Sequence, residues 1–130
     1  MLAGLGLASH FAVGCSGPSV AAGKTLYEDN GCASCHGHDG RGDGPAAPNL
    51  PAKPINFHDV ATFERGYSEE AIAQTIAQGI SGEHYVPTLH MTLHLWLMPK
   101  FDHLSKAERR SIALYIISFH ASDQQRSVQP

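Results

Sequence analysis

The chain has 130 residues and a formal net charge of −3 at pH 7, and hydrophobic and charged residues make up 42% and 16% of it. These values are typical of one ordinary globular domain, and they exclude a disordered chain and a basic nucleic-acid-binding protein. A domain of this size leaves a large share of its surface exposed, so a bulky cofactor would enlarge its core.

The first fourteen residues, MLAGLGLASHFAVG, are apolar and rich in small residues, but they are fewer than the roughly 20 needed to span a bilayer. We interpret residues 1–14 as a secretory signal peptide. Residues 12–15, Ala-Val-Gly-Cys, resemble the lipobox of bacterial lipoproteins. This resemblance implies a lipid on Cys15 and a place on the periplasmic side of a bacterial membrane. The alternative is ordinary signal cleavage, which leaves a soluble periplasmic protein.

A short Ser/Gly/Pro-containing tether at residues 15–21 precedes a domain that we place at residues 22–121, with a polar tail at residues 122–130. Within the domain, the stretch from Gly37 to Phe57 is rich in glycine and proline. Proline disrupts helix interiors and central strands, so this composition predicts a long loop.

Three helices are predicted in this domain. Ser19 caps the first, which ends just before a pair of cysteines, and Ser68 caps the second, which stops at Gly79. The last is the clearest, because Ser105 and Glu108 form a capping box. A core-facing stripe follows it at helical spacing: Ile112, Tyr115, Ile116 and Phe119. No strand and no internal repeat is predicted, so the expected fold class is small and all-α, with long loops.

Cys32, Cys35 and His36 form a Cys-x-x-Cys-His motif, which is the attachment signature of c-type haem. In one helical turn, thiols three residues apart lie on the same face, where each can bond one vinyl group of a porphyrin. The next residue then brings its imidazole to the iron. We therefore expect one haem c, held covalently by two thioethers and ligated by His36.

Three other interpretations use the same residues. A thioredoxin-like thiol pair requires a βαβ setting, and no strand precedes Cys32. A zinc site could combine both cysteines with His90 and His94, but the gap between the two pairs is far longer than in a zinc finger, and His36 has no role in it. A disulfide between Cys32 and Cys35 closes too short a loop to stabilise the chain much.

The haem iron needs a ligand on its second face. Met98, in the segment LWLMPKF, offers a thioether, which raises the reduction potential when it is paired with histidine.

From Ala22 to Phe119 the chain resembles a single-haem class I cytochrome c, which has the cysteine motif after its first helix, a Gly/Pro loop, a middle helix, a Met-Pro pair and a closing helix. The resemblance implies that Met98 is the sixth ligand. Pro48-Asn49-Leu50 lies where many members have Gly-Pro-Asn-Leu. The resemblance implies that the Pro48 carbonyl accepts the His36 Nδ1 proton and that Leu50 packs on the porphyrin.

Gly23 and Tyr27 are similar to the family's small and aromatic pair on the first helix. The resemblance implies that this helix crosses the last one closely, at positions that match Ile112 and Tyr115.

The chain departs from the family pattern between the middle helix and Met98, where a longer stretch carries a second methionine and three histidines: Met91, His84, His90 and His94. Each is a candidate sixth ligand, and the histidines, with His103, could together bind copper or zinc. We favour polar loop positions for the histidines. The apolar residues Met91, Leu93, Leu95, Trp96 and Leu97 are expected to pack in the core or haem pocket, with a membrane-binding segment as the alternative.

An iron with both axial positions filled has no open site for a substrate, so we expect a single-electron carrier, not an enzyme, in an exported bacterial electron-transfer chain. Its expected partners are redox proteins that dock transiently at the exposed haem edge beside Lys53 and Lys100, and a membrane reached through the lipid on Cys15. One alternative is a haem-based sensor or ligand-binding protein with a labile or histidine sixth ligand. Another is a cytochrome subunit of a larger respiratory complex.

Overall fold

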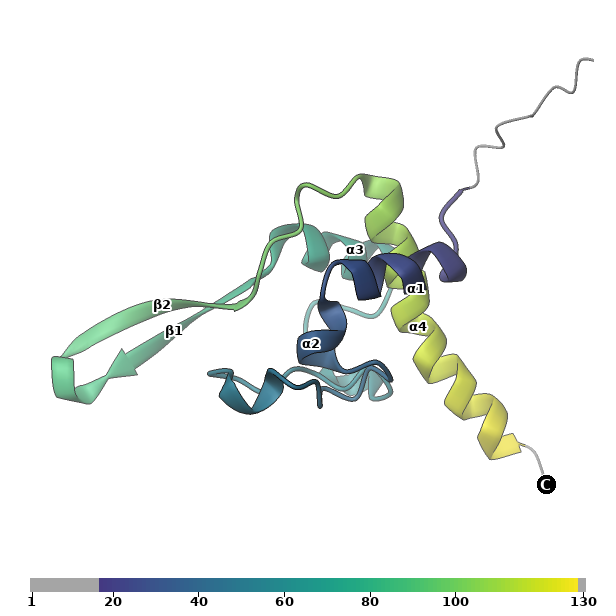
Figure 1. Ribbon diagram of the computed structural model, residues 1–130. Helices are drawn as coiled ribbons and strands as arrows, with labels where there is room; N and C mark the ends of the chain where they lie inside the picture. The colour runs from purple at the N-terminus through teal and green to yellow at the C-terminus, as the bar shows by residue number, and fades with distance from the viewer. Residues whose placement is uncertain (1–16, 129–130) are drawn as a thin grey trace, which may run out of the picture.

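The computed structural model describes residues 17–128, drawn in Figure 1. The predicted signal peptide and Cys15 lie outside these residues. The helices and strands follow in the order α1 (Val20–Asp29), α2 (Cys32–His36), α3 (Glu69–Gln78), β1 (Ile80–Val86), β2 (Met91–Met98) and α4 (Lys106–Val128). Three short 3₁₀ helices lie in the connecting segments: Ala47–Asn49, Val60–Thr62 and Pro87–Leu89. In the part of the chain that the structure describes, no helix is both long and apolar enough to cross a membrane.

The three helices predicted from capping residues are all present. The hydroxyls of Ser19 and Ser68 each accept a hydrogen bond, 3.2 Å long, from the backbone N–H three residues on. At the start of α4 the capping box is complete. Ser105 N–H donates to the Glu108 carboxylate (2.7 Å), and Glu108 N–H donates to the Ser105 hydroxyl (3.2 Å). The domain is therefore mostly helical, as predicted.

Helices α1 and α4 cross in close contact, and Gly23 is the residue that permits it. A Cβ atom at this position would lie 1.9 Å from the carbonyl oxygen of Ser111 and 2.9 Å from Cβ of Tyr115. One helical turn further on, the Tyr27 ring meets the Tyr115 ring edge-on, with centroids 5.3 Å apart. The crossing lies where the resemblance placed it.

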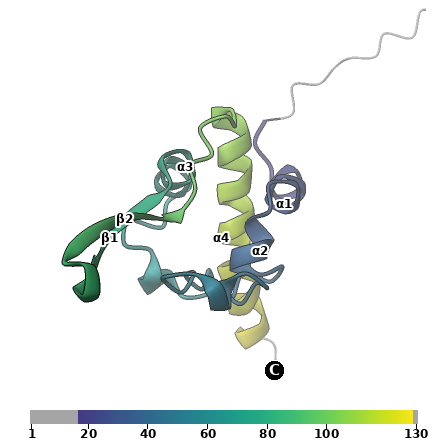
Figure 2. The ribbon, with the colours of Figure 1, turned by 60° about the vertical axis from the view of Figure 1, so that its left-hand side comes forward.

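Helix α4 lies between α1 and α3 (Figure 2) and carries most of the core. Its buried side chains Ile112 and Ile116 form one cluster with Ile72 and Ile76 of α3 and with Tyr27 of α1. An ion pair between Arg110 and Glu69 links α4 to the first turn of α3.

Strands β1 and β2 form an antiparallel hairpin that extends away from the helices (Figure 1), in a segment where no strand was predicted. The sequence of β2 explains why a strand forms here. Apolar residues at every second position alternate with Thr92, His94 and Trp96, and side chains in a strand alternate with a period of two. Met91, Leu93 and Trp96, expected in the core or haem pocket, are instead exposed. The prediction was wrong for these three residues.

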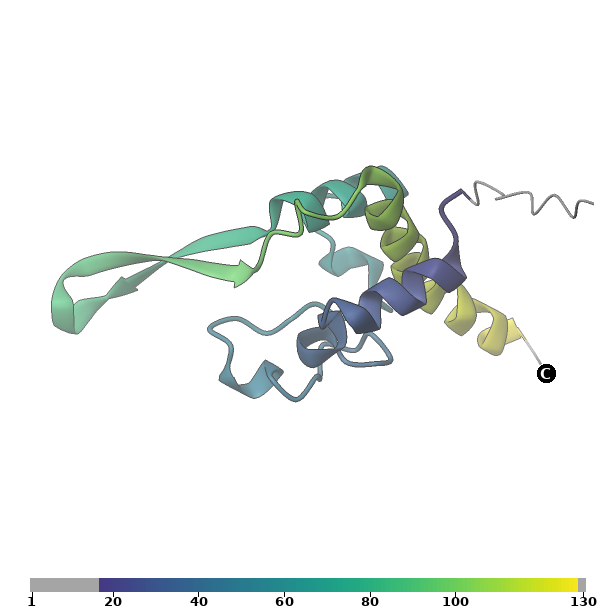
Figure 3. The same ribbon diagram turned by 45° about the horizontal axis from the view of Figure 1, so that its top comes forward.

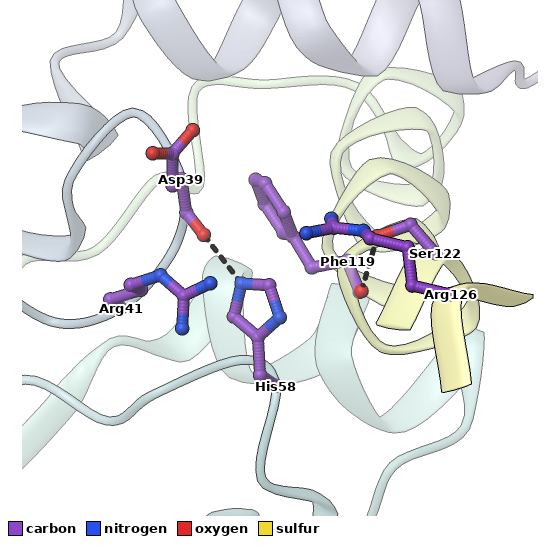
Figure 4. A pocket seen from close by; sticks show the side chains of 6 residues that line it. All are labelled: Asp39, Arg41, His58, Phe119, Ser122 and Arg126. Atoms are coloured by element: carbon purple, nitrogen blue, oxygen red, sulfur yellow. Dashed lines mark hydrogen bonds between the residues drawn. The ribbon is translucent and has the colours of Figure 1, made fainter. Parts of the chain in front are cut away.

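Residues 122–128 of the predicted polar tail are helical, because α4 continues to Val128. His58 joins this end of α4 to the loop at Asp39. Its Nδ1 hydrogen-bonds the Asp123 carboxylate, and its Nε2 lies 2.7 Å from the Asp39 carbonyl oxygen. Figure 4 shows His58 between the 39–41 loop and the end of α4. A cavity of about 290 Å³ adjoins it, lined by Asp39, Arg41, His58, Phe119, Ser122 and Arg126. Both partners of His58 are acceptors, so the ring makes both bonds only when both nitrogens carry a proton.

Replacing Gly23 by alanine is expected to lower the free energy of unfolding by about 1–3 kcal/mol, because the new methyl group overlaps the α4 backbone. Chemical denaturation of the haem-loaded protein measures this. Lys24→Ala, at an exposed position of the same helix, is the control and should have little effect. Equal stability of Gly23→Ala and wild type would contradict the close crossing.

The hydrogen bond from His58 holds the pKa of Asp123 below its ordinary value of 3.8. A carboxylate with a lowered pKa contributes stability above its unfolded-state pKa and loses it as the pH falls through the folded-state value. Asp123→Asn should therefore be less stable than wild type near neutral pH, and the difference should shrink as the pH falls below about 5 and vanish below the lowered folded-state pKa of Asp123. Denaturation at several pH values measures this, with Asp102→Asn, an exposed carboxylate, as control. A wild-type minus Asp123→Asn difference that does not change with pH would refute this role of Asp123.

Candidate functional site

Helix α2 brings Cys32, Cys35 and His36 together in just over one turn. It starts after Gly31, which adopts a left-handed conformation (φ 71°), and stops at Gly37. Both thiols are free, so the disulfide alternative is not what the structure shows. Burial raises the pKa of Cys32 to about 11, which keeps it a neutral thiol near pH 7. A neutral thiol is unlike the thiolate that a redox-active pair requires.

A cavity of about 620 Å³ lies beside α2. Its walls are mainly apolar and come from almost every element. Five residues predicted for the site line it: Cys32, Cys35, His36, Leu50 and Met98. Met98 reaches it from the last position of β2, so the structure places both candidate axial ligands and both thiols around one space.

His36 is held as a neutral imidazole. Burial lowers its pKa below 6.5, and the backbone of Ile55 offsets this only in part. Its Nδ1 is the one buried side-chain nitrogen or oxygen in the described residues without a hydrogen-bond partner, so Ile55 does not reach hydrogen-bond geometry. A neutral imidazole next to two free thiols in an apolar cavity is a donor set that fits a covalently attached haem.

The resemblance implied that Pro48 lies at His36, but the structure does not place it there. Pro48 is exposed in the 3₁₀ helix Ala47–Asn49 and does not line the cavity, whereas Pro54 and Ile55 do. Gly42 explains the difference. With φ at 73°, it donates its N–H to the His36 carbonyl (2.8 Å) while its Cα lies against the Pro54 carbonyl, where a Cβ would come within 2.3 Å. The loop therefore folds back and presents its second Pro/Asn segment to α2.

Phe57 is a site residue that the sequence analysis missed. Its side chain is only 4% exposed, and its ring stacks on the His36 imidazole with centroids 4.6 Å apart and planes at 22°. Its backbone N–H donates to the Gly40 carbonyl (2.8 Å), which fixes the loop. The available signal was the segment Pro54 to Phe57, which repeats the proline, asparagine and apolar residue of Pro48-Asn49-Leu50 in a slightly longer form.

Tyr27 connects α1 to the end of the motif helix. Its hydroxyl donates a 2.7 Å hydrogen bond to the carbonyl of Gly37, the residue after His36. Burial raises the pKa of Tyr27, so the phenol stays protonated and remains a donor. This bond fixes the position at which the His36 backbone leaves α2.

Charged residues line one part of the cavity: Lys53, Glu64 and Arg65. The Arg65 guanidinium donates to the Gly79 carbonyl (3.2 Å), which links this wall to the end of α3. Lys53 thus lines the cavity, whereas Lys100 does not. The ammonium of Lys100 lies 4.8 Å from the centre of the Trp96 ring instead.

Three other candidate ligands of the inserted stretch, His90, His94 and Met91, do not line the cavity. His90 and His94 are exposed on the hairpin, and His94 Nε2 is 3.6 Å from a carboxylate oxygen of Glu83. Met91 is also exposed. Within residues 17–128, no three histidine, cysteine or acidic side chains gather as a metal site would require. The zinc and copper interpretations therefore gain no support.

Tyr27→Phe is expected to lower the free energy of unfolding by about 1 kcal/mol, because the buried Gly37 carbonyl loses the shorter of its two hydrogen bonds and keeps only the 3.2 Å bond from Gly40 N–H. The haem absorption spectrum should stay unchanged, since no ligand is removed. Thermal denaturation measures the loss, and Tyr85→Phe, on the exposed hairpin, is the matched control. Equal losses of stability in Tyr27→Phe and Tyr85→Phe would contradict a specific stabilising role of the Tyr27–Gly37 hydrogen bond.

Comparisons with known proteins agree with this site. The family model described as Cytochrome c matches residues 20–119. No curated protein matches the chain. Among solved structures, it is similar to a chain of the Kuenenia stuttgartiensis reducing HAO-like protein complex Kustc0457/Kustc0458, at 31% sequence identity and a TM-score of 0.60, over 77% of this chain and 43% of that one. Because the family match spans the motif, the cavity and Met98, the chain belongs to the cytochrome c family.

Proposed function

We propose that this cytochrome is a single-electron carrier with one haem c, ligated by His36 and Met98. The observation that carries the proposal is the shared cavity, which is lined by both thiols of α2, by His36 and by Met98. The resemblance of Met98-Pro99, at the end of β2, to the family's Met-Pro pair also supports it.

A bound haem supplies an iron that gains or loses one electron without making or breaking bonds to a substrate. The chain's own residues determine how it is held. Cys32 and Cys35 anchor it to α2, and His36 offers a neutral imidazole whose orientation is fixed by stacking on Phe57. Leu50 and the aliphatic side chains of α3 and α4 exclude water from the cavity. If His36 and Met98 both bound the iron, no coordination position would be left for a substrate, which supports a carrier over an enzyme.

Residues around His36 and Met98 tune the reduction potential. A thioether opposite a histidine raises the potential relative to a second histidine. His36 Nδ1 has no hydrogen-bond partner in the described residues, and a bond from it to the nearby Ile55 backbone, if formed around the haem, would make the imidazole a stronger donor. The apolar walls of the cavity also affect the reduction potential, because burial disfavours added charge on the iron.

We place the protein on the periplasmic side of a bacterial membrane, anchored by a lipid on Cys15. The lipobox-like segment supports this, and transient redox proteins are the proposed partners. The net charge of −3 supports only modest electrostatic steering toward them. A second candidate function is that of a subunit in a larger oxidoreductase assembly. It is supported by the similarity to a chain of a reducing HAO-like protein complex.

Met98→Ala tests the ligand. The oxidised wild type should be low-spin, with the weak far-red absorption band of a methionine–iron(III) bond, and Met98→Ala should lose this band and bind carbon monoxide when reduced. Absorption spectra of both redox states measure this. Met91→Ala is the matched control, because Met91 is exposed on the same strand and should leave the spectrum unchanged. A wild type without the band, or one that binds carbon monoxide rapidly, would favour a sensor.

A further inference from the structure

His58 is a buried histidine that has no part in the proposed haem ligation. Its side chain is only 8% exposed, and it does not line the cavity beside α2. The residue directly before it is Phe57, whose ring stacks on the His36 imidazole. A constraint on His58 is therefore also a constraint on the side chain that packs on the candidate haem ligand.

Every polar atom of His58 has a hydrogen-bond partner. The ring bonds the Asp123 carboxylate through Nδ1 and the Asp39 carbonyl through Nε2. The backbone N–H donates to the side-chain oxygen of Asn56 (3.0 Å), and the backbone carbonyl accepts from His120 Nδ1 (3.0 Å). Helix α4 thus holds His58 at two points, and the ring cannot turn without losing a bond to α4 or to the loop.

The segment 39–40 holds the same two residues from the other side. The Gly40 carbonyl accepts a 2.8 Å hydrogen bond from Phe57 N–H, and the carbonyl before it, that of Asp39, is the one that His58 Nε2 reaches at 2.7 Å. Figure 4 shows His58 between this segment and the end of α4. The His58 side chain therefore connects α4 to a segment that the Phe57 backbone alone joins only to its own loop.

The Phe57 ring packs against both the site and α4. It stacks on His36, with centroids 4.6 Å apart, and on Phe119 of α4, with centroids 6.1 Å apart and planes at 23°. The Phe119 ring in turn meets the His58 ring, with centroids 5.5 Å apart. Loss of the His58 ring would therefore loosen the packing on the α4 side of Phe57.

The position of Phe57 matters to the site because the ring covers one face of the His36 imidazole. In the described residues His36 Nδ1 has no hydrogen-bond partner, so stacking on Phe57 is the contact that sets the orientation of this imidazole. The orientation of an axial ligand and the exclusion of water around it both affect the reduction potential of a haem.

We propose that His58 is a positioning residue of the haem site: by joining the loop to α4, it holds Phe57 on the His36 imidazole and so raises the reduction potential. The proposal rests on the proposed function, in which His36 ligates the haem iron. Water that reaches a loosened imidazole stabilises the oxidised iron, which carries the greater charge, so a looser Phe57 lowers the potential.

Redox titration of the haem-loaded full chain tests this proposal. His58→Ala removes both ring bonds and should lower the midpoint potential. It should also shift the g values of the oxidised iron in electron paramagnetic resonance, which depend on the orientation of the axial imidazole. Its haem absorption spectrum should remain that of the wild type, which shows that the ligands are kept. His58→Gln, a milder change, should shift the potential in the same direction.

His94→Ala is the matched control. His94 also faces a carboxylate, that of Glu83, but it is exposed on the hairpin, which extends away from the helices (Figure 3). This variant should leave both the midpoint potential and the g values unchanged. An equal shift in His94→Ala would overturn the proposal, because the effect would then not require contact with Phe57.

A double-mutant cycle with Phe57→Leu tests whether His58 acts through Phe57. Phe57→Leu alone should lower the potential, and adding His58→Ala to it should change the potential little further. Full additivity would overturn the proposal, because His58 would then act on the iron independently of Phe57. Unchanged potential and g values in both His58 variants would also overturn it.

Loss of the wild-type haem spectrum in both His58→Ala and His58→Gln would overturn the proposal too, because His58 would then support the whole domain and not the position of one ligand. Failure of the proposed Met98 ligation is a separate result. It would appear in the wild-type spectrum and in Met98→Ala, whereas the cycle compares potentials that are set on the His36 side of the haem.

Discussion

The cavity beside α2 is the constraint around which this small domain is organised. Side chains from α1, α2, α3 and α4, from the loop segments 50–57 and 62–66 and from the base of the hairpin surround about 620 Å³ of space. Core residues such as Ile72, Ile76, Ile112 and Ile116 have the cavity on one side and each other on the other. A chain of 130 residues has little apolar surface to spare, so a bound porphyrin completes its core.

Two contacts on the same side of the cavity hold the motif helix in place. The Tyr27 hydroxyl holds the chain at Gly37, and Phe57 packs on the imidazole of His36. Both aromatic rings belong to one cluster with Tyr115 and Phe119 of α4. The position of His36 is thus set by the crossing of α1 and α4, where Gly23 determines how closely the helices approach.

The helices and the motif could be predicted from local sequence signals, whereas features that depend on tertiary contacts could not. The caps at Ser19, Ser68 and Ser105 act within one turn, so their sequences suffice. The loop after His36 was harder to predict, because it holds two Pro/Asn segments and only the fold-back at Gly42 selects the second one. The hairpin escaped prediction because its apolar residues were assigned to a core, although their spacing of two was present in β2.

Ile80 and Met98 are cross-strand partners, so the chain enters and leaves the hairpin at adjacent points. Residues added or removed in matched pairs beyond this junction would change the reach of the hairpin while Gly79 and Met98 keep their places. The outer hairpin can therefore differ in length without displacing Met98 from the cavity.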